Sequence, residues 1–104
     1  SLQHLEPACK LREKFQYNNL MYTIAGIIIE KVTGQTYEEA LSSRIFNPLA
    51  MLNSNSSVQE SQKNEDFSIP YAEKAGEIKA IPFRSIHACA PAGAINSSVS
   101  DMLK

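Results

Sequence analysis

The sequence of 104 residues predicts a mainly α-helical chain with one small β-hairpin. Two stretches in its first half repeat apolar residues at three- and four-residue spacing, which is typical of helices that bury one face. A later stretch alternates apolar and polar residues on both sides of Gly76, which is typical of a short hairpin. Apolar residues make up 43% and charged residues 20% of the chain, as in an ordinary globular protein.

The first predicted helix covers residues 20–33. Either Asn18 or Asn19 can cap its start, and Gly34 suits the position after its end. Its apolar side chains extend nearly around the helix. They are Leu20, Met21, Ile24, Ala25, Ile27, Ile28, Ile29 and Val32. A helix that is apolar on most sides is expected to be covered by protein on most sides.

A second helix is predicted over residues 36–46, directly after the first. Thr36 and Glu39 have the spacing of a capping box, in which the hydroxyl accepts from a helix amide and the carboxylate reaches back. An apolar stripe at four-residue spacing consists of Tyr37, Leu41 and Ile45. Pro48 is expected to end the helix and to push Asn47 out of the helical conformation. The two helices form a tight αα-hairpin.

Residues 53–66 are almost entirely polar and predict a solvent-exposed loop. A hairpin is then predicted over residues 67–83, with Gly76 in its turn. Its apolar pairs are Ile69 and Tyr71 on one strand, opposite Ile81 and Phe83 on the other. Pro70 and Pro82 restrict these strands to edge pairing, because proline lacks the N–H group.

A last helix is predicted over residues 97–104. Ser98 can cap its start, and Asp101 stands three residues later, where it can complete a capping box. The helix stops after about two turns, which is too short for a helix that is stable alone. We therefore expect the chain to be part of a longer protein.

Charge and cysteine content argue against several classes of function. The formal net charge of −1 argues against a nucleic-acid partner, which needs clustered lysines and arginines. No apolar run reaches the roughly 18 residues of a membrane-spanning helix, and the first ten residues do not resemble a signal peptide. A zinc site formed by Cys9, Cys89, His4 and His87 is disfavoured because neither C-x-x-C nor H-x-x-x-H occurs. We expect two buried free thiols rather than a disulfide.

Tyr17 and Asn19 stand two residues apart, just before the first predicted helix. Taken alone, they predict a helix cap beside a packed ring, because asparagine is a common cap. Their surroundings change this interpretation, since four stretches follow one another in order. These are F-x-Y-x-N-x-x-Y at Phe15–Tyr22, I-I-E-K-V-T-G at Ile28–Gly34, I-F-x-P-L-x-M at Ile45–Met51, and P-A-G with S-x-x-D within Pro91–Asp101. The ordered set resembles the serine β-lactamase and penicillin-binding-protein superfamily, and more narrowly its class C branch with related D-alanyl-D-alanine carboxypeptidases and esterases.

This resemblance implies that the chain is part of the helical subdomain of an α+β enzyme, in which the serine of an S-x-x-K motif attacks an acyl carbon. Tyr17 would transfer the proton of that serine, with nearby lysines of other motifs favouring the ionised phenol. Asn19 would orient the substrate carbonyl and the catalytic lysine, because a carboxamide both donates and accepts. The helical side of the site would be lined by Pro91, Ala92, Gly93 and Ala94. Neither a metal nor a cofactor is implied.

The substrate implied by the resemblance is a β-lactam, a D-Ala-D-Ala peptide or an ester. The parent protein would be bacterial and would act in the periplasm or elsewhere outside the cytoplasm. Two motifs are absent, because no serine is followed by lysine three residues later and K-T-G does not occur. A tyrosine without a nucleophile cannot perform acyl transfer, so we expect the chain to be the inactive middle fragment of a hydrolase.

Two further expectations follow from this reading. The alternative function is a non-catalytic sensor or binding module that recognises penicillins, and an upstream S-x-x-K motif would distinguish the enzyme from the sensor. The apolar surface left without its cover predicts self-association of the fragment.

Three residues depart from the family pattern. Asn18 stands where the family usually has serine, Ala50 replaces the glycine of P-L-G-M, and Ala94 replaces the second glycine of P-A-G-G. That second glycine often occupies a left-handed or closely approached position, so Ala94 is expected to carry strain or to shift the backbone. None of the three changes removes a catalytic group.

Overall fold

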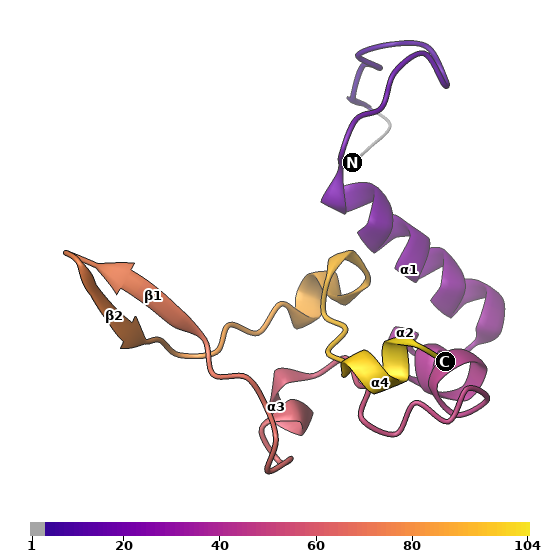
Figure 1. The fold of residues 1–104 in the computed structure, drawn as a ribbon. Coiled ribbons are helices and arrows are strands. Elements are labelled where there is room, and N and C mark those ends of the chain that lie inside the picture. The colour runs from indigo at the N-terminus through magenta and orange to yellow at the C-terminus, as the bar shows by residue number, and fades with distance from the viewer. Residues whose placement is uncertain (1–3) are drawn as a thin grey trace.

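The computed structural model describes residues 4–104, and most of its regular structure is helical (Figure 1). In chain order its elements are α1 (Asn19–Thr33), α2 (Tyr37–Leu41), the π-helical turn η2 (Ser42–Phe46), α3 (Val58–Ser61), β1 (Tyr71–Lys74), β2 (Glu77–Ala80), the 3-10 segment η3 (His87–Ala92) and α4 (Val99–Met102). The two strands form an antiparallel sheet. The predicted fold class, mainly α with one hairpin, is therefore confirmed.

The start of α1 distinguishes the two neighbouring asparagines. Asn18 is the cap, because its Oδ1 accepts from the amides of Leu20 at 2.9 Å and Met21 at 3.3 Å. Asn19 is the first helical residue. The helix ends at Gly34, whose φ of 69° is left-handed and whose amide donates to the Glu30 carbonyl.

The capping box at α2 is present in both directions. The Thr36 amide donates to Glu39 Oε2 at 2.8 Å, and the Glu39 amide donates to Thr36 Oγ1 at 3.2 Å. The prediction for Asn47 is wrong, because its φ of −66° and ψ of −48° are helical. Asn47 continues the π-helical turn η2, because its amide donates five residues back to the Ser42 carbonyl, and this bond outweighs the local preference of a residue before proline.

The buried core is small. Leu41, Phe46 and Met51 form its cluster, and the half-buried Tyr37 packs against them. The radius of gyration is 17.1 Å, compared with about 13 Å for a compact domain of this length. Gly26 is the buried residue of α1, whereas Val32 is 80% exposed. The apolar circumference predicted for α1 therefore lies largely open within the described chain.

The polar stretch 53–66 is not entirely a loop, because it contains α3. Ser57 caps this single turn by accepting from the Glu60 amide at 3.4 Å. Propensity patterns miss such a turn because only Val58 is apolar in it. Among the described residues, no helix is both long and apolar enough to cross a membrane.

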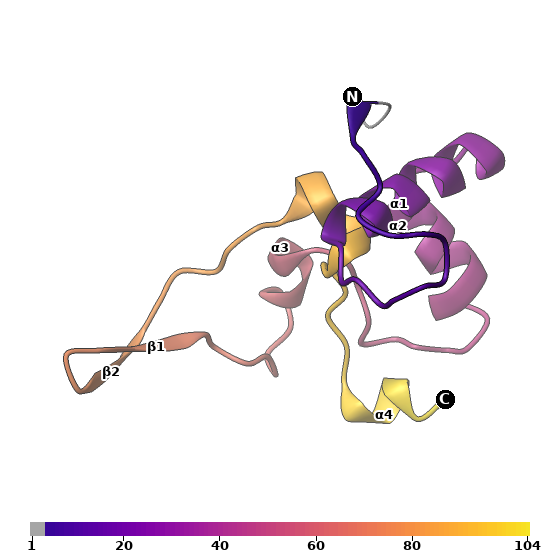
Figure 2. The same cartoon turned by 90° about the horizontal axis from the view of Figure 1, so that it is seen from above.

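The hairpin is shorter than predicted and its register differs. Tyr71 pairs with Ala80 and Lys74 with Glu77, so the predicted pairing of Tyr71 with Ile81 or Phe83 is wrong. The two-residue turn between the strands sets this register. The hairpin projects away from the helices in both views (Figures 1 and 2).

The hairpin turn carries strain that a substitution can relieve. Ala75 has φ 53° and Gly76 has φ 81°, as in a type I′ turn, in which Asn-Gly is preferred. Ala75→Asn is therefore expected to stabilise the hairpin by about 0.5–1 kcal/mol, since asparagine tolerates the left-handed conformation better than alanine. Amide hydrogen exchange of β1 and β2 measures this effect, and unchanged or faster exchange would contradict it.

The last helix is shorter than the predicted span 97–104. Ser98 caps α4 by accepting from the Asp101 amide at 3.2 Å, as the sequence predicts. The second half of the predicted capping box is replaced by tertiary contacts. The Asp101 carboxylate bonds to residues of a distant loop and to Lys104.

Candidate active site

A cavity of about 210 Å³ lies between the start of α1 and η3. Its lining consists of Tyr17, Tyr22, Tyr37, Ala90, Pro91, Ala92, Gly93 and Ile95. The fold thus brings together two groups of predicted site residues that are far apart in the sequence. We refer to this space as the Tyr17 cavity.

Two predicted site residues do not line the Tyr17 cavity. Asn19 is absent from its lining, although it follows Tyr17 closely in the chain. Ala94 instead lines a neighbouring cavity of about 460 Å³, together with Gly93. Gly93 therefore lies at the boundary between the two cavities.

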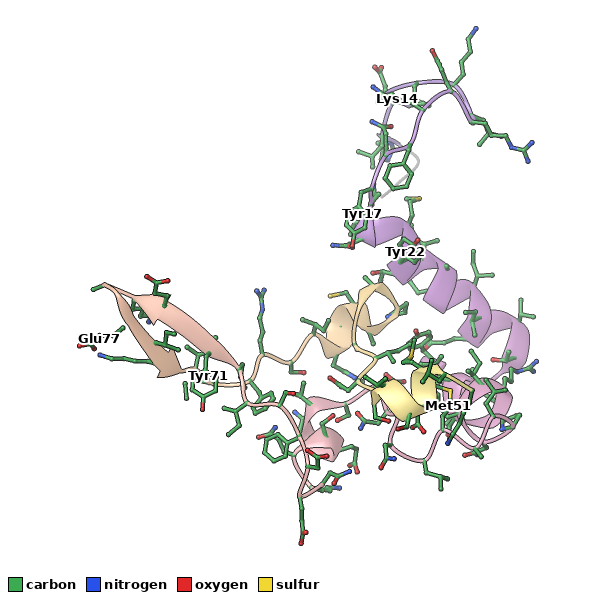
Figure 3. All side chains as sticks on the ribbon, viewed as in Figure 1. Lys14, Tyr17, Tyr22, Met51, Tyr71 and Glu77 are labelled. Carbon is green, nitrogen blue, oxygen red and sulfur yellow. The ribbon has the colours of Figure 1, made fainter. Side chains whose placement is uncertain are left out.

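Tyr17 is accessible and uncommitted. Its side chain is 73% exposed, and within residues 4–104 its phenol has no hydrogen-bond partner. Figure 3 shows Tyr17 and Tyr22 close together at the beginning of α1. No lysine or arginine is among the residues that line the Tyr17 cavity. A cation that favours the ionised phenol must therefore come from outside this lining.

Asn19 is also uncommitted. Because Asn18 supplies the cap, the carboxamide of Asn19 is not needed to satisfy the helix start, and it has no hydrogen-bond partner in the described chain. The local interpretation of this motif as a helix cap therefore applies to Asn18 only. Nothing in the described chain prevents the Asn19 amide from donating and accepting elsewhere.

Tyr37 forms a neutral part of the cavity wall. Partial burial and the neighbouring carboxylate of Glu38 both raise the pKa of Tyr37 above its ordinary value of 10.0. The phenol therefore stays protonated at neutral pH. Tyr17 and Tyr37 consequently have different environments, although both line the same cavity.

The opposite wall is formed by η3 and the glycine that follows it. Gly93 has φ 157° and ψ 22°, a conformation that residues with a Cβ rarely adopt. The amides of Gly93 and Ala94 both donate to the Ala90 carbonyl, at 3.1 and 2.9 Å. These bonds hold the turn after η3 in one shape.

The strain expected at Ala94 is found elsewhere. Ala94 was expected to carry strain or to shift the backbone, and it is not among the described residues with positive φ, so left-handed strain is absent there. Ala50 has φ 51°, and it stands where the family pattern P-L-G-M has glycine. The position of that glycine is therefore left-handed in this chain, where an alanine occupies it at some cost in strain.

Asp101 is a buried residue whose role the sequence reasoning missed. It is 1% exposed, and its carboxylate accepts from the Asn53 amide at 2.7 Å, Ser54 Oγ at 2.9 Å and Lys104 Nζ at 2.9 Å. Burial by itself raises the pKa of Asp101, but the bonds from Lys104, Ser54 and Asn53 outweigh it and hold the pKa below the ordinary value of 3.8.

A second contact reinforces this attachment. Asn55 and Asn96 exchange backbone hydrogen bonds of 3.0 and 2.8 Å, and their side chains also bond at 3.3 Å. We call the Asp101 bonds and this bridge the Asp101 clamp. The clamp fixes residues 96–101 to residues 53–55 and thereby anchors the chain just after the cavity wall. An Asp three residues after a serine signals a capping box, so the sequence pattern concealed this tertiary role.

The remaining candidate ligands do not form a metal site in the described chain. No group of three or more His, Cys, Asp or Glu side chains is arranged to hold an ion in this part of the chain. Cys9 and Cys89 are free, and Cys9 is half-buried while Cys89 is exposed, so the prediction of buried thiols is wrong. His87 Nδ1 lies 3.5 Å from Glu38 Oε1 at the surface.

Comparison with known proteins agrees with the sequence motifs. The Beta-lactamase family profile matches residues 1–104. The Unguisins hydrolase ungD of Aspergillus violaceofuscus is 28% identical over 110 residues, which cover 100% of this chain and 19% of that protein. Gigasin-6 of Magallana gigas is 26% identical over 106 residues, which cover 99% of this chain and 35% of that protein.

A solved structure is also similar. The octameric penicillin-binding protein homologue from Pyrococcus abyssi superposes with a TM-score of 0.79 and 37% sequence identity, over 91% of this chain and 21% of that chain. The present chain therefore spans about a fifth to a third of the length of these relatives. Their sources show that similarity of this kind is not restricted to bacteria.

Proposed function

Because this chain belongs to the beta-lactamase family, within the serine β-lactamase and penicillin-binding-protein superfamily, we propose that it supplies one wall of an acyl-transfer site. In this proposal Tyr17 is the proton-transfer residue and Asn19 is the orienting amide. Pro91, Ala92, Gly93 and Ala94 line the helical side. The observation that carries the proposal is the Tyr17 cavity, which joins the Tyr-x-Asn segment to the P-A-G segment.

The proposed reaction uses a serine from outside this chain. Its hydroxyl oxygen attacks the substrate's acyl carbon, its proton passes to the Tyr17 phenolate, and the proton then goes to the departing amine or alcohol. Water cleaves the acyl-serine in a second step. A free phenol with a pKa of about 10 is a weak base at neutral pH, so lysines of the S-x-x-K and K-T-G motifs must lie nearby.

The 104-residue chain is proposed to be inactive by itself, because neither motif occurs in it. The proposed substrates of the whole protein are β-lactams, D-Ala-D-Ala peptides or esters, since all present an acyl carbon with a leaving group. One of the relatives is named a hydrolase and another a penicillin-binding protein homologue, which supports this class. For the peptide substrate we propose a location outside the cytoplasm.

A second candidate is a sensor that binds the same substrates without turnover. The observation behind it is that the cavity lining contains no serine, cysteine or lysine, so this part of the chain can contact a substrate without providing the groups that turn it over. The sequence of the whole protein decides between the two, because the enzyme needs an S-x-x-K motif upstream of Tyr17.

Tyr17→Phe in the full-length protein tests the enzyme directly. We expect kcat/KM for a chromogenic β-lactam or an activated ester to fall by about 10²–10⁴-fold, because the phenol can no longer transfer the proton. Tyr71→Phe is the matched control, since Tyr71 lies in the projecting hairpin (Figure 3), and it should leave the rate unchanged. Full activity of Tyr17→Phe would refute the assigned role, and binding without turnover in the wild type would favour the sensor.

We also propose that the isolated chain self-associates. Many large apolar side chains on α1 are exposed, and Ile28 and Ile29 both line an apolar groove between α1 and α2. Size-exclusion chromatography with light scattering should show an average mass that rises with concentration. A monomer at every concentration would contradict this expectation.

A further inference from the structure

Gly26 lies where α1 meets η3. It is the buried residue of α1, and η3 packs directly against this helix. A Cβ built on Gly26 would lie 2.8 Å from Pro91 Cβ and closer still to Pro91 Cγ. Contacts this short do not occur between real side chains, so the Pro91 ring occupies the space that any side chain at position 26 would fill.

The contact lies beside the Tyr17 cavity rather than inside it. Pro91 lines the Tyr17 cavity, and Gly26 does not. Gly26 instead lines the neighbouring cavity of about 300 Å³, which also contains Pro91. Tyr37 and Ala90 line both cavities as well, but Pro91 is the residue whose atoms a Cβ on Gly26 would meet.

The wall cannot readily move away to relieve a clash. On its C-terminal side, the chain is anchored by the Asp101 clamp, including the reciprocal backbone bonds of Asn55 and Asn96. The other wall is carried by α1, which contains Gly26 and begins two residues after Tyr17. A side chain at position 26 would therefore change the distance between Tyr17 and the segment Pro91–Gly93.

We propose that Gly26 is a positioning residue that fixes the width of the Tyr17 cavity by admitting the Pro91 ring against α1. The kinetic part of this inference rests on the proposed acyl transfer, whereas the structural part does not. Helix propensity works in the opposite direction, because alanine favours a helix interior more than glycine does. A loss caused by Gly26→Ala therefore cannot be attributed to a weakened α1.

The test is a double-mutant cycle in the full-length protein with Gly26→Ala, Pro91→Ala and both together. Gly26→Ala should lower kcat/KM about tenfold to a hundredfold, which is the range expected when reacting groups are misplaced by about 1 Å. Pro91→Ala removes Cγ, the ring atom nearest to the new methyl group, and so relieves the larger part of the clash, while the contact with Cβ at 2.8 Å is left to a small shift of the backbone. It should lower kcat/KM in the wild-type background but raise it several-fold in the Gly26→Ala background, and this change of sign is the signature of the contact.

A second readout separates the positioning role from the proposed reaction. The ¹⁹F resonance of fluorotyrosine at position 17 should shift in Gly26→Ala and return toward the wild-type position in the double variant. Ala25→Ser, at the exposed neighbouring position, is the matched control and should move neither readout. If the wild type shows no acyl transfer but the ¹⁹F cycle behaves as expected, the proposed function fails and the positioning role stands. Independent substitutions would multiply their effects on kcat/KM and add their changes in ¹⁹F shift. If both readouts show only this, the positioning role is wrong.

Discussion

Replacing Phe46 with alanine is expected to lower the free energy of unfolding by about 3–5 kcal/mol, the range for removing a buried aromatic ring. Phe46 is 7% exposed, and it is the largest member of a cluster otherwise made of Leu41 and Met51. Its carbonyl also accepts from the Met51 amide at 2.8 Å, so the ring and the backbone turn support each other. Because the described core is so small, little other packing can compensate for the cavity.

Urea unfolding of the 104-residue chain, followed by circular dichroism, measures this effect. Leu52→Ala is the matched control, because Leu52 is near the same turn but 85% exposed, and it should change the stability by no more than about 0.5 kcal/mol. Equal losses from both variants would show that Phe46 does not hold the structure together. Loss of η2 in the Phe46 variant should also speed amide exchange from residues 42–51.

Replacing Asp101 with asparagine is expected to lower the midpoint of thermal unfolding on the order of 10 °C at neutral pH. The carboxylate accepts three hydrogen bonds in a buried place, and the amide presents only one acceptor oxygen. The substitution also removes the charge that pairs with Lys104, whose ammonium group in addition donates to the Ala50 carbonyl. Both halves of the Asp101 clamp should loosen.

The Asp101 prediction has a defined pH dependence. The pKa of Asp101 in the folded chain lies below the ordinary value of 3.8, so the folded state favours the ionised form. Its stabilising contribution is therefore fully present above about pH 3.8 and disappears as the pH falls through the lower folded-state pKa. The difference in stability between wild type and Asp101→Asn should be large at pH 7 and should shrink below pH 3.8.

Unfolding measured from pH 7 to about pH 2.5 checks this behaviour. Asp66→Asn is the control, because Asp66 lies in an exposed stretch outside the clamp. It should leave the pH profile close to that of the wild type. A difference between wild type and Asp101→Asn that stays constant down to the lowest pH would mean that the charge of Asp101 is not what stabilises the clamp.

Local features of this protein were predictable because they depend on neighbours in the sequence. The capping box of Thr36 and Glu39, the end of α1 at Gly34 and the serine cap of α4 all join groups within four residues of each other. The ordered motifs also indicated the family that the profile and the solved structure support. Where both asparagines could cap α1, the sequence left the choice open, and the backbone geometry assigned it to Asn18.

Features that depend on distant partners were not predictable in the same way. Asp101 carries the pattern of a helix cap, yet its carboxylate bonds to Asn53 and Ser54, which no short-range spacing reveals. The hairpin register was mispredicted because apolar alternation allows several pairings, whereas the two-residue turn allows one. Ala94 was expected to carry strain or to shift the backbone, whereas the left-handed φ is found at Ala50, because φ depends on how the whole turn is held.

The sequence by itself determined α1, α2, the start of α4, the caps at Thr36 and Ser98, the family, and Tyr17 and Asn19 as candidate site residues. Only the tertiary structure decided that Tyr17 and Pro91 line one cavity and that the space beside Gly26 is filled by the proline ring. The physical reason is the range of the interactions. Helices and caps arise from contacts over three or four residues, which a sequence pattern displays directly, whereas the cavity and the clamp arise from close packing between segments whose meeting is set by the path of the chain.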